Sequence, residues 1–547
     1  MTYHYITANQ GGISTGTGDV TLEAQGVAIS GSIDMRYQAG GVTYNGGGNQ
    51  TVVISGGVLG SIDDYYGLTS GNDAITITQS GYIDFYSFGA VFLAGGGNTV
   101  TNNGTITASN YAGAIYILGS VGTNLSSPDT IENTGVISGS ETVNQTGEAV
   151  VQVSCASVSI DNTGSILASV GVVGIYINAT ASTSTLFNSG LITGGISESG
   201  NAIALTNMGV IEGAVSLFNG SVVTDSGKIT APLSLSLGTI NIDNAHITIS
   251  GSGDAVRITG GTDNSVTIGG NGTNGTADVI NGSNANIVVT ASSNVTVNGN
   301  TDTVDIGPSS NAAISGFNET IYFYGGPGNL ANLFETANSW DTVFGSNGNI
   351  ALNTAQANVL GGGNTIGFAT VSNNVVELYA TNNNFDQVSG TGGLVALNTA
   401  QANVTGGGIT VDLASGSGNI AELYGTNNNW DQVYGSSGLV ALNSAQSNVT
   451  GNNDVIDMQG SSGNLLGLYG NSESVNFQAL FGISGIVGFN ASDVMGFSKS
   501  DFVNFQALQS HTSQSGGNAV ITLDGSDSLT LYNTTASTLT SSQFNFT

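Results

Sequence analysis

The residues best suited to chemistry in this sequence are carboxylates that recur at short spacing in segments rich in glycine and asparagine. Asp302 and Asp305 lie in NTDTVDI, and Asp454 and Asp457 lie in GNNDVIDM. Ca²⁺ prefers oxygen ligands, and carboxylates in turns commonly supply them. The spacing therefore makes these four aspartates candidate calcium ligands, with solvated turn carboxylates as the alternative interpretation.

A second set of carboxylates recurs at a fixed interval of 45 residues. Each follows an aromatic residue, in the pairs Trp340–Asp341, Phe385–Asp386 and Trp430–Asp431. Because the aromatic changes between Trp and Phe, we interpret it as one rung of a packing stack rather than a specific contact. The aspartates would then form a row, whose mutual repulsion favours exposure or a shared cation. We expect the interval to hold about two coils of a solenoid.

Catalysis has few residues to draw on. The 547 residues include only 4 Lys and Arg, 3 His and 1 Cys, so groups that titrate near neutral pH or stabilise anionic transition states are scarce. The most enzyme-like cluster, Asp63-Asp64-Tyr65-Tyr66, fits a polar turn, because adjacent strand residues point to opposite faces. Cys155 lies in VVQVSCASVSI and is expected to be buried. We expect a protein that is not an enzyme, with a polysaccharide-active enzyme as the least favoured alternative.

The charge balance restricts the partners. Asp and Glu number 36 against 4 Lys and Arg, which gives a formal net charge of -32. Such a surface repels nucleic acid and anionic lipid and attracts divalent cations. No apolar run is long enough for a membrane-spanning helix. The opening segment MTYHYITANQGG lacks the basic and apolar regions of a signal peptide, so export would take another route.

The elements that must position these residues are short strands. Alternating runs such as AIYILG and GIYINA are bounded by Gly, Asn or Ser, which is typical of strands between tight turns. A pattern Asn-x-Gly-x-Ile recurs, and its first residues are Asn102, Asn133, Asn162, Asn188, Asn207 and, as a variant, Asp225. A turn amide followed by one inward aliphatic predicts an all-β fold, a right-handed parallel β-helix forming a single elongated rod. Equivalent asparagines would stack into hydrogen-bonded ladders.

Four segments follow from these patterns. We predict a β-rich start or cap over 1–95, Asn-x-Gly-x-Ile coils over 96–310, the 45-residue repeats over 311–480, and a distinct C-terminal β segment over 481–547.

The C-terminal segment from Asp501 carries the clearest family resemblance. It has an amide-rich opening, a strand over 519–523, a turn at Asp524, a strand with Leu529 and Leu531, and an ending with Phe544 and Phe546. It resembles the uncleaved secretion region of RTX-type proteins exported by type I secretion. The Asn-x-Gly-x-Ile region looks like the β-helical passengers of bacterial adhesins and autotransporters. The sequence departs from the RTX pattern in one respect, since the tandem calcium nonapeptide does not occur in proper copies.

These features predict an extracellular structural protein that assembles head to tail with copies of itself into a filament, a surface layer (S-layer) or a biofilm matrix fibre. The alternative is a monomeric adhesin or glycan-binding rod on the cell surface, with polysaccharide as its partner. Because open solenoid ends invite another chain, we expect the assembly contacts at Tyr3 and Tyr5 and at Phe544 and Phe546.

Overall fold

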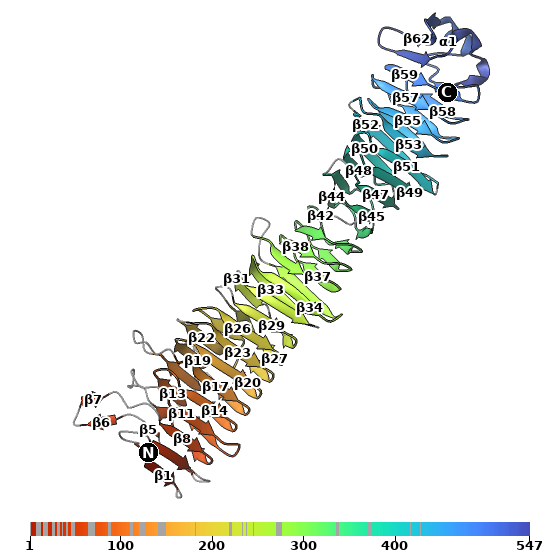
Figure 1. The fold of residues 1–547 in the computed structure, drawn as a ribbon. Helices are drawn as coiled ribbons and strands as arrows, with labels where there is room; N and C mark the ends of the chain where they lie inside the picture. The colour runs from red at the N-terminus through yellow and green to blue at the C-terminus, as the bar shows by residue number, and fades with distance from the viewer. Residues whose placement is uncertain are drawn as a thin grey trace. The chain divides into compact units, whose positions relative to one another are not determined.

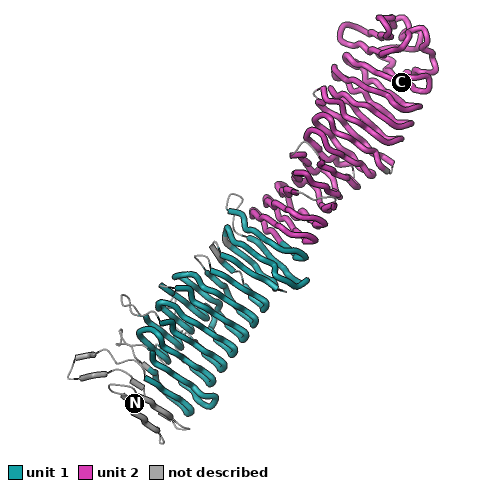
Figure 2. The backbone as a smooth tube through the Cα atoms, in the orientation of Figure 1, with its two compact units in different colours: residues 1–287 teal, residues 288–547 magenta. Residues whose placement is uncertain are grey.

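The computed structural model describes residues 50–547 apart from 64–71, 86–88, 110–112, 120–126, 141–148, 181, 218–220, 232, 237, 244, 270–275, 335–338, 370–372, 382, 416 and 427. Before residue 50 it describes only the backbone of β1 (Thr2–Ile6), β2 (Ile13–Ser14), β3 (Val20–Ala24), β4 (Ala28–Ile29), β5 (Ile33–Asp34), β6 (Tyr37–Ala39) and β7 (Val42–Tyr44). The chain divides into two compact units, residues 1–287 and 288–547 (Figure 2). The division of the chain into four segments, made from the sequence, stays a prediction.

Unit 1 is a β-solenoid whose coils carry three strands each. One coil consists of β14 (Thr99–Asn102), β15 (Thr105–Ala108) and β16 (Ile115–Leu118), and the next of β17 (Asp129–Asn133), β18 (Val136–Gly139) and β19 (Ala149–Cys155). Strands in equivalent positions pair in parallel, β14 with β17, β15 with β18 and β16 with β19. The predicted inward isoleucines, such as Ile106 and Ile137, are fully buried. Each coil therefore shares one aliphatic interior with the next, as the pattern predicts.

The asparagine ladder of unit 1 confirms the sequence prediction. The side-chain amide of Asn102 donates to Asn133 Oδ1 at 2.8 Å, and the same bond continues through Asn162, Asn188 and Asn207 to Asp225. The glycine two places on is required because the turns stack closely. A Cβ added to Gly135 would lie 2.1 Å from the Gly104 carbonyl oxygen.

Unit 1 has one sheet, the one that holds β15 and β18, which ends part-way along the unit. Its last strand is β30 (Lys228–Ile229), and no later strand of the described chain joins it. Beyond it, β32 (Thr239–Asp243) pairs with β34 (Ala255–Gly260), and β33 (His246–Ser252) pairs with β35 (Asn264–Gly269). The coil therefore changes from three strands to two within the unit.

Unit 2 consists of two-strand coils. We name its sheets by strand number. Sheet I holds the even-numbered strands from β38 (Asn294–Asn298) to β60 (Val494–Phe497), followed by β64 (Phe544–Phe546). Sheet II holds the odd-numbered strands from β39 (Thr303–Ile306) to β59 (Ile483–Val487). Strands pair in parallel with the next strand but one, as β42 does with β44 and β43 does with β45. Inward residues such as Leu352, Leu397 and Leu442 are fully buried.

Each 45-residue repeat contains five strands and so spans two and a half coils. The first has β42 (Leu330–Phe334), β43 (Asp341–Phe344), β44 (Asn349–Asn353), β45 (Gln356–Leu360) and β46 (Thr365–Phe368). The second has β47 (Val375–Tyr379), β48 (Asp386–Thr391), β49 (Leu394–Asn398), β50 (Gln401–Gly407) and β51 (Thr410–Ser415). The third has β52 (Ile420–Tyr424), β53 (Asp431–Gly435), β54 (Leu439–Asn443), β55 (Gln446–Thr450) and β56 (Val455–Met458). The expectation of two coils is wrong, because an odd number of strands fills the interval.

The C-terminal end of unit 2 closes differently on its two sheets. In sheet II, β59 (Ile483–Val487) pairs in parallel with β63 (Ser528–Tyr532), which continues antiparallel into β62 (Asn518–Thr522) and β61 (Thr512–Ser515). In sheet I, β60 (Val494–Phe497) pairs with β64 (Phe544–Phe546). The short helix α1 (Phe505–Ser510) precedes β61 (Figure 1).

Phenylalanines replace the aliphatic interior at this end. Phe497 stacks on Phe477 with ring centroids 4.7 Å apart and meets Phe481 and Phe502 edge-on. Phe544 joins this group through Phe497 and Phe505. We call Phe477, Phe481, Phe497, Phe502 and Phe544 the phenylalanine plug.

Candidate functional site

The predicted calcium ligands are not brought together within either pair. Asp302 and Asp454 are buried at the turns before β39 (Thr303–Ile306) and β56, whereas Asp305 and Asp457 point outward from these strands. In each pair, one aspartate therefore faces the interior of the solenoid and the other faces its outer surface. In the part of the chain that the structure describes, no group of three or more His, Cys, Asp or Glu could hold a metal ion. Calcium binding stays a prediction.

The row of Asp341, Asp386 and Asp431 does not exist. Asp341 and Asp431 begin strands of sheet II, and Asp386 begins a strand of sheet I. The expected stack of Trp340, Phe385 and Trp430 fails for the same reason. The expectation of exposure is also wrong, since the three side chains are 1%, 0% and 0% exposed.

Each of these aspartates satisfies a backbone donor of the preceding coil. Asp341 Oδ1 accepts from the Glu319 N–H at 3.0 Å, Asp386 Oδ1 from Asn364 at 2.7 Å, and Asp431 Oδ1 from Ile409 at 2.9 Å. Burial outweighs these bonds and raises the pKa of all three aspartates to about 7. The carboxyls therefore act as turn acceptors that join one coil to the next.

Two columns extend this arrangement into stacked acids. Glu319 Oε2 accepts from the Asp302 N–H at 2.7 Å, while the Glu319 N–H donates to Asp341. In the second column Glu473 Oε2 accepts from the Asp454 N–H at 2.8 Å, and the Glu473 N–H donates to Asp493. Glu319 Oε1 and Glu473 Oε1 are buried with no hydrogen-bond partner among the described residues.

The neighbouring acids and burial both act on the two glutamates. Burial, followed by the charge of Asp302, raises the pKa of Glu319 to about 8, and burial raises the pKa of Glu473 to about 7. Neither glutamate was singled out from the sequence. The sequence pattern that could have identified them is an acidic residue immediately before a strand, with another such residue one coil away.

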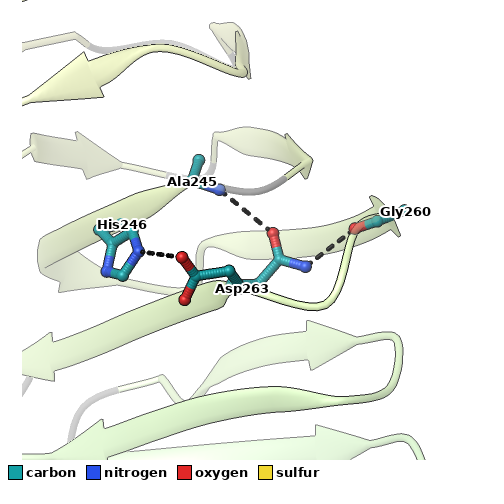
Figure 3. Close-up of polar contacts among 5 residues, drawn as sticks. Ala245, His246, Gly260 and Asp263 are labelled. Atoms are coloured by element: carbon teal, nitrogen blue, oxygen red, sulfur yellow. Dashed lines mark hydrogen bonds and ion pairs between the residues drawn. The ribbon is translucent and has the colours of Figure 1, made fainter.

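The histidines and the cysteine supply no catalytic arrangement in the described structure. His246 Nε2 lies 3.4 Å from Asp263 Oδ2, but these side chains are 63% and 83% exposed (Figure 3). The adjacent Asn264 ties Ala245 to Gly260 through its amide. Cys155 is buried as predicted, and its thiol donates to the Ser157 carbonyl oxygen. The side chains of the Asp63-Asp64-Tyr65-Tyr66 cluster lie outside the described residues.

The outer faces of unit 2 repeat one polar surface motif. On sheet I the Tyr424 hydroxyl donates to Glu422 Oε2 at 2.6 Å. On sheet II Tyr379 forms the same kind of bond with Glu377, 45 residues earlier. Burial and the bond to Glu377 raise the pKa of Tyr379 to about 12, and the bond to Glu422 and burial raise the pKa of Tyr424 to about 12. Each is a Glu–Tyr pair with both residues half-buried on one strand.

The predicted assembly residues divide into two groups. Phe544 is buried in the phenylalanine plug, so its ring is not available to a partner, while Phe546 is half-buried at the end of β64. The side chains of Tyr3 and Tyr5 lie outside the described residues, although their backbone belongs to β1, which pairs in parallel with β3. Their role in assembly stays a prediction.

The structure defines the class as a β-solenoid of parallel coils. Comparison with protein-family models, with curated proteins and with solved structures finds no match. Within the described residues, no helix combines the length and apolar character needed to cross a membrane.

Proposed function

We propose that this protein is a non-catalytic extracellular structural protein, exported by type I secretion, whose copies join end to end into a filament, surface layer or biofilm matrix fibre. The observation that carries the proposal is the edge of β64. Among the described residues β64 pairs with β60 alone, so one edge of sheet I has no strand neighbour at this end. An unpaired edge is a template for another strand.

The direction of the backbone groups identifies which atoms would bind. The Thr547 N–H donates to the Phe497 carbonyl oxygen at 3.1 Å, so it faces β60. Successive N–H groups alternate in direction along a strand, which turns the Phe546 N–H away from β60. The partner would be β1 of a second copy, which joins β3 in parallel and would extend sheet I in the same sense.

The other strands at the C-terminal end of unit 2 favour one specific contact over nonspecific association. Sheet II ends in β61, a short strand whose Ser513, Gln514 and Ser515 are exposed, and short polar edges resist uncontrolled pairing. The phenylalanine plug keeps the adjacent β64 in place through Phe544. Only one of the two sheets thus offers an edge over a firmly packed interior.

Type I export is supported by the resemblance of the C-terminal segment. The strands and turn that carry it correspond to β62, β63 and the residues between them, where the Asp524 carboxylate accepts from the Ser526 N–H. Export is tested separately from assembly, by expressing the chain with and without residues 501–547 beside a type I secretion apparatus and assaying the medium.

Assembly is tested by replacing the outward donor. Phe546→Pro removes the Phe546 N–H but leaves the Thr547 N–H bonded to β60, and Phe546→Ala is the matched control that keeps the donor. Negative-stain images should show filaments or layers for the unchanged chain and for Phe546→Ala, and single particles for Phe546→Pro. Assembly of Phe546→Pro equal to that of Phe546→Ala would reject strand addition at β64.

A further inference from the structure

The half-coil in each repeat places one surface motif on both outer faces of unit 2. Because a repeat holds five strands, a residue 45 positions later lies on the opposite sheet. On sheet I, Glu422 stands in register between Asn403 and Ala441. On sheet II, Glu377 stands in register between Asn358 and Ala396. The order Asn, Glu, Ala over three successive rungs is therefore the same on both faces.

The tyrosine of each pair extends the correspondence. Tyr424 is in register with Asn443, and Tyr379 is in register with Asn398. The motif then has five members on each face. On sheet I they are Asn403, Glu422, Tyr424, Ala441 and Asn443, and on sheet II they are Asn358, Glu377, Tyr379, Ala396 and Asn398.

Only these two copies of the motif are complete. The first repeat has Asn332 and Phe334 where the pair would stand, and the position after the third repeat has Gly467 beside Tyr469. The repeat region therefore presents one complete motif to each side.

The chemistry of the motif suits hydroxyl groups. A carboxylate accepts from hydroxyl donors and a tyrosine ring supplies a flat apolar surface, while the amides of Asn403 and Asn443 already donate to Gln387 and Gln459. The Tyr424–Glu422 bond at 2.6 Å fixes the ring and the carboxylate together. On the adjacent rung, Ala441 and Ala396 are buried beneath their neighbours, so the half-buried glutamate and tyrosine are the groups of each pair that reach solvent.

Charge selects among hydroxyl-rich partners. The four basic residues, Arg36, Lys228, Arg257 and Lys499, all lie outside the three repeats, so neither face carries a cation for an anionic polymer. A second copy of this chain would set acidic face against acidic face here, unlike the end-to-end contact, which joins backbone groups at β64. A neutral polysaccharide meets neither obstacle and would extend across several rungs.

We propose that the repeat region binds neutral polysaccharide at the Asn–Glu–Ala motif on each of its two faces, and thereby cross-links polymer chains. The contact goes beyond end-to-end assembly and uses a different surface. Two equivalent sites facing opposite ways join two polymer chains, which one face could not do.

The test uses the full chain with hydroxyethylcellulose, a soluble neutral glucan, and alginate as the anionic comparison. The variant pairs are matched: Glu422→Gln with Tyr424→Ala for sheet I, Glu377→Gln with Tyr379→Ala for sheet II, and all four together. The unchanged chain should be retarded in a gel containing hydroxyethylcellulose, but not in one containing alginate, and should raise the light scattering of the glucan solution.

Each one-face variant should keep retardation with about half the bound glucan, and its light scattering should fall to that of the separate components. The four-fold variant should lose retardation. Tyr424→Phe with Tyr379→Phe keeps ring packing but removes the hydroxyl bonds, so it should bind more weakly even if the alanine variants misfold. Tyr324→Ala, at an exposed tyrosine before the repeats, is the control that should bind normally.

Absence of binding by the unchanged chain, or unchanged retardation of a folded four-fold variant, would overturn the proposal. Equal retardation in alginate would overturn the choice of a neutral partner. Cross-linking by a one-face variant would overturn the assignment of one site to each face. End-to-end assembly, measured without glucan, is unaffected by these outcomes.

Discussion

Asp386 and Asp431 occupy the same position of successive repeats, yet they begin strands on opposite sheets of unit 2. The cause is the count of five strands in 45 residues. A whole number of coils would have stacked these carboxyls on one sheet. The half-coil instead distributes buried acids, outward amides and Glu–Tyr pairs over both faces.

The first prediction concerns pH. The pKa of Glu319 is raised to about 8, and those of Asp341, Asp386, Asp431 and Glu473 to about 7. In the unfolded chain such groups titrate near pH 4. The folded state therefore binds more protons between about pH 4 and 7, so the stabilisation present at low pH is lost as pH rises through this window.

Each such group changes the free energy of unfolding by up to about 1.4 kcal/mol per pH unit within its window. Urea unfolding of unit 2 should show a higher midpoint at pH 5 than at pH 8. A midpoint that rises from pH 5 to pH 8 would contradict the assignment of buried, protonated acids.

The second prediction removes one ionisable group. Glu319→Gln keeps an oxygen for the Asp302 N–H and cannot ionise, so its free energy of unfolding at pH 8 should exceed that of the unchanged chain by about 1–3 kcal/mol. At pH 4 the difference should vanish. Glu212→Gln, at an exposed position, is the control that should change neither value. A destabilised Glu319→Gln at pH 8 would show that the charge is needed.

The third prediction concerns the asparagine ladder. Asn162→Ala removes one of the two acceptors of the Asn133 amide, which keeps its bond to the Ser165 carbonyl oxygen, and removes the buried donor to Asn188 Oδ1. The free energy of unfolding of unit 1 should fall by about 1–3 kcal/mol, the cost of one unsatisfied buried group. Asn103→Ala, at an exposed turn position, should cost under about 1 kcal/mol. Equal losses in the two variants would show that the ladder contributes no special stability.

The fourth prediction concerns the phenylalanine plug. Phe497→Ala opens a cavity among four aromatic contacts and should cost about 3–5 kcal/mol. Limited proteolysis should then cleave first between residues 498 and 547. Val503→Ala is the control, because Val503 is 66% exposed. If residues 498–547 resist proteolysis equally in Phe497→Ala and in Val503→Ala, the phenylalanine plug does not anchor the C-terminal segment.

The sequence predicts the solenoid and its ladder because both follow from local rules. The Asn-x-Gly-x-Ile pattern specifies a turn amide, a residue without Cβ where turns stack, and one inward aliphatic, and nothing distant changes these roles. Conversely, the sheet that Asp386 joins depends on whether 45 residues hold an odd or even number of strands. Equal spacing contains no such information, so a row on one sheet was a wrong inference.

For the candidate sites too, some features follow from local sequence and others depend on the number of strands in a repeat. Asp341 and Glu319 are buried because each lies in a turn that packs against the neighbouring coil. Considered alone in a sequence, an acidic residue would be expected to be exposed to solvent. The predicted calcium pairs fail to converge because residues three apart around a strand start face opposite sides. The Glu–Tyr pairs could be located from the 45-residue interval, but their placement on two faces required the strand count.

End-to-end assembly is tested most directly by using Phe546→Pro as a chain terminator. This variant keeps its N-terminal end, so it should add to the β64 edge of a growing filament and offer no donor to the next copy. Mixed at one part in ten with the unchanged chain, it should shorten filaments measured by electron microscopy to about ten subunits, whereas Phe546→Ala should leave their length unchanged. Filaments of unaltered length in the Phe546→Pro mixture would contradict assembly through β64.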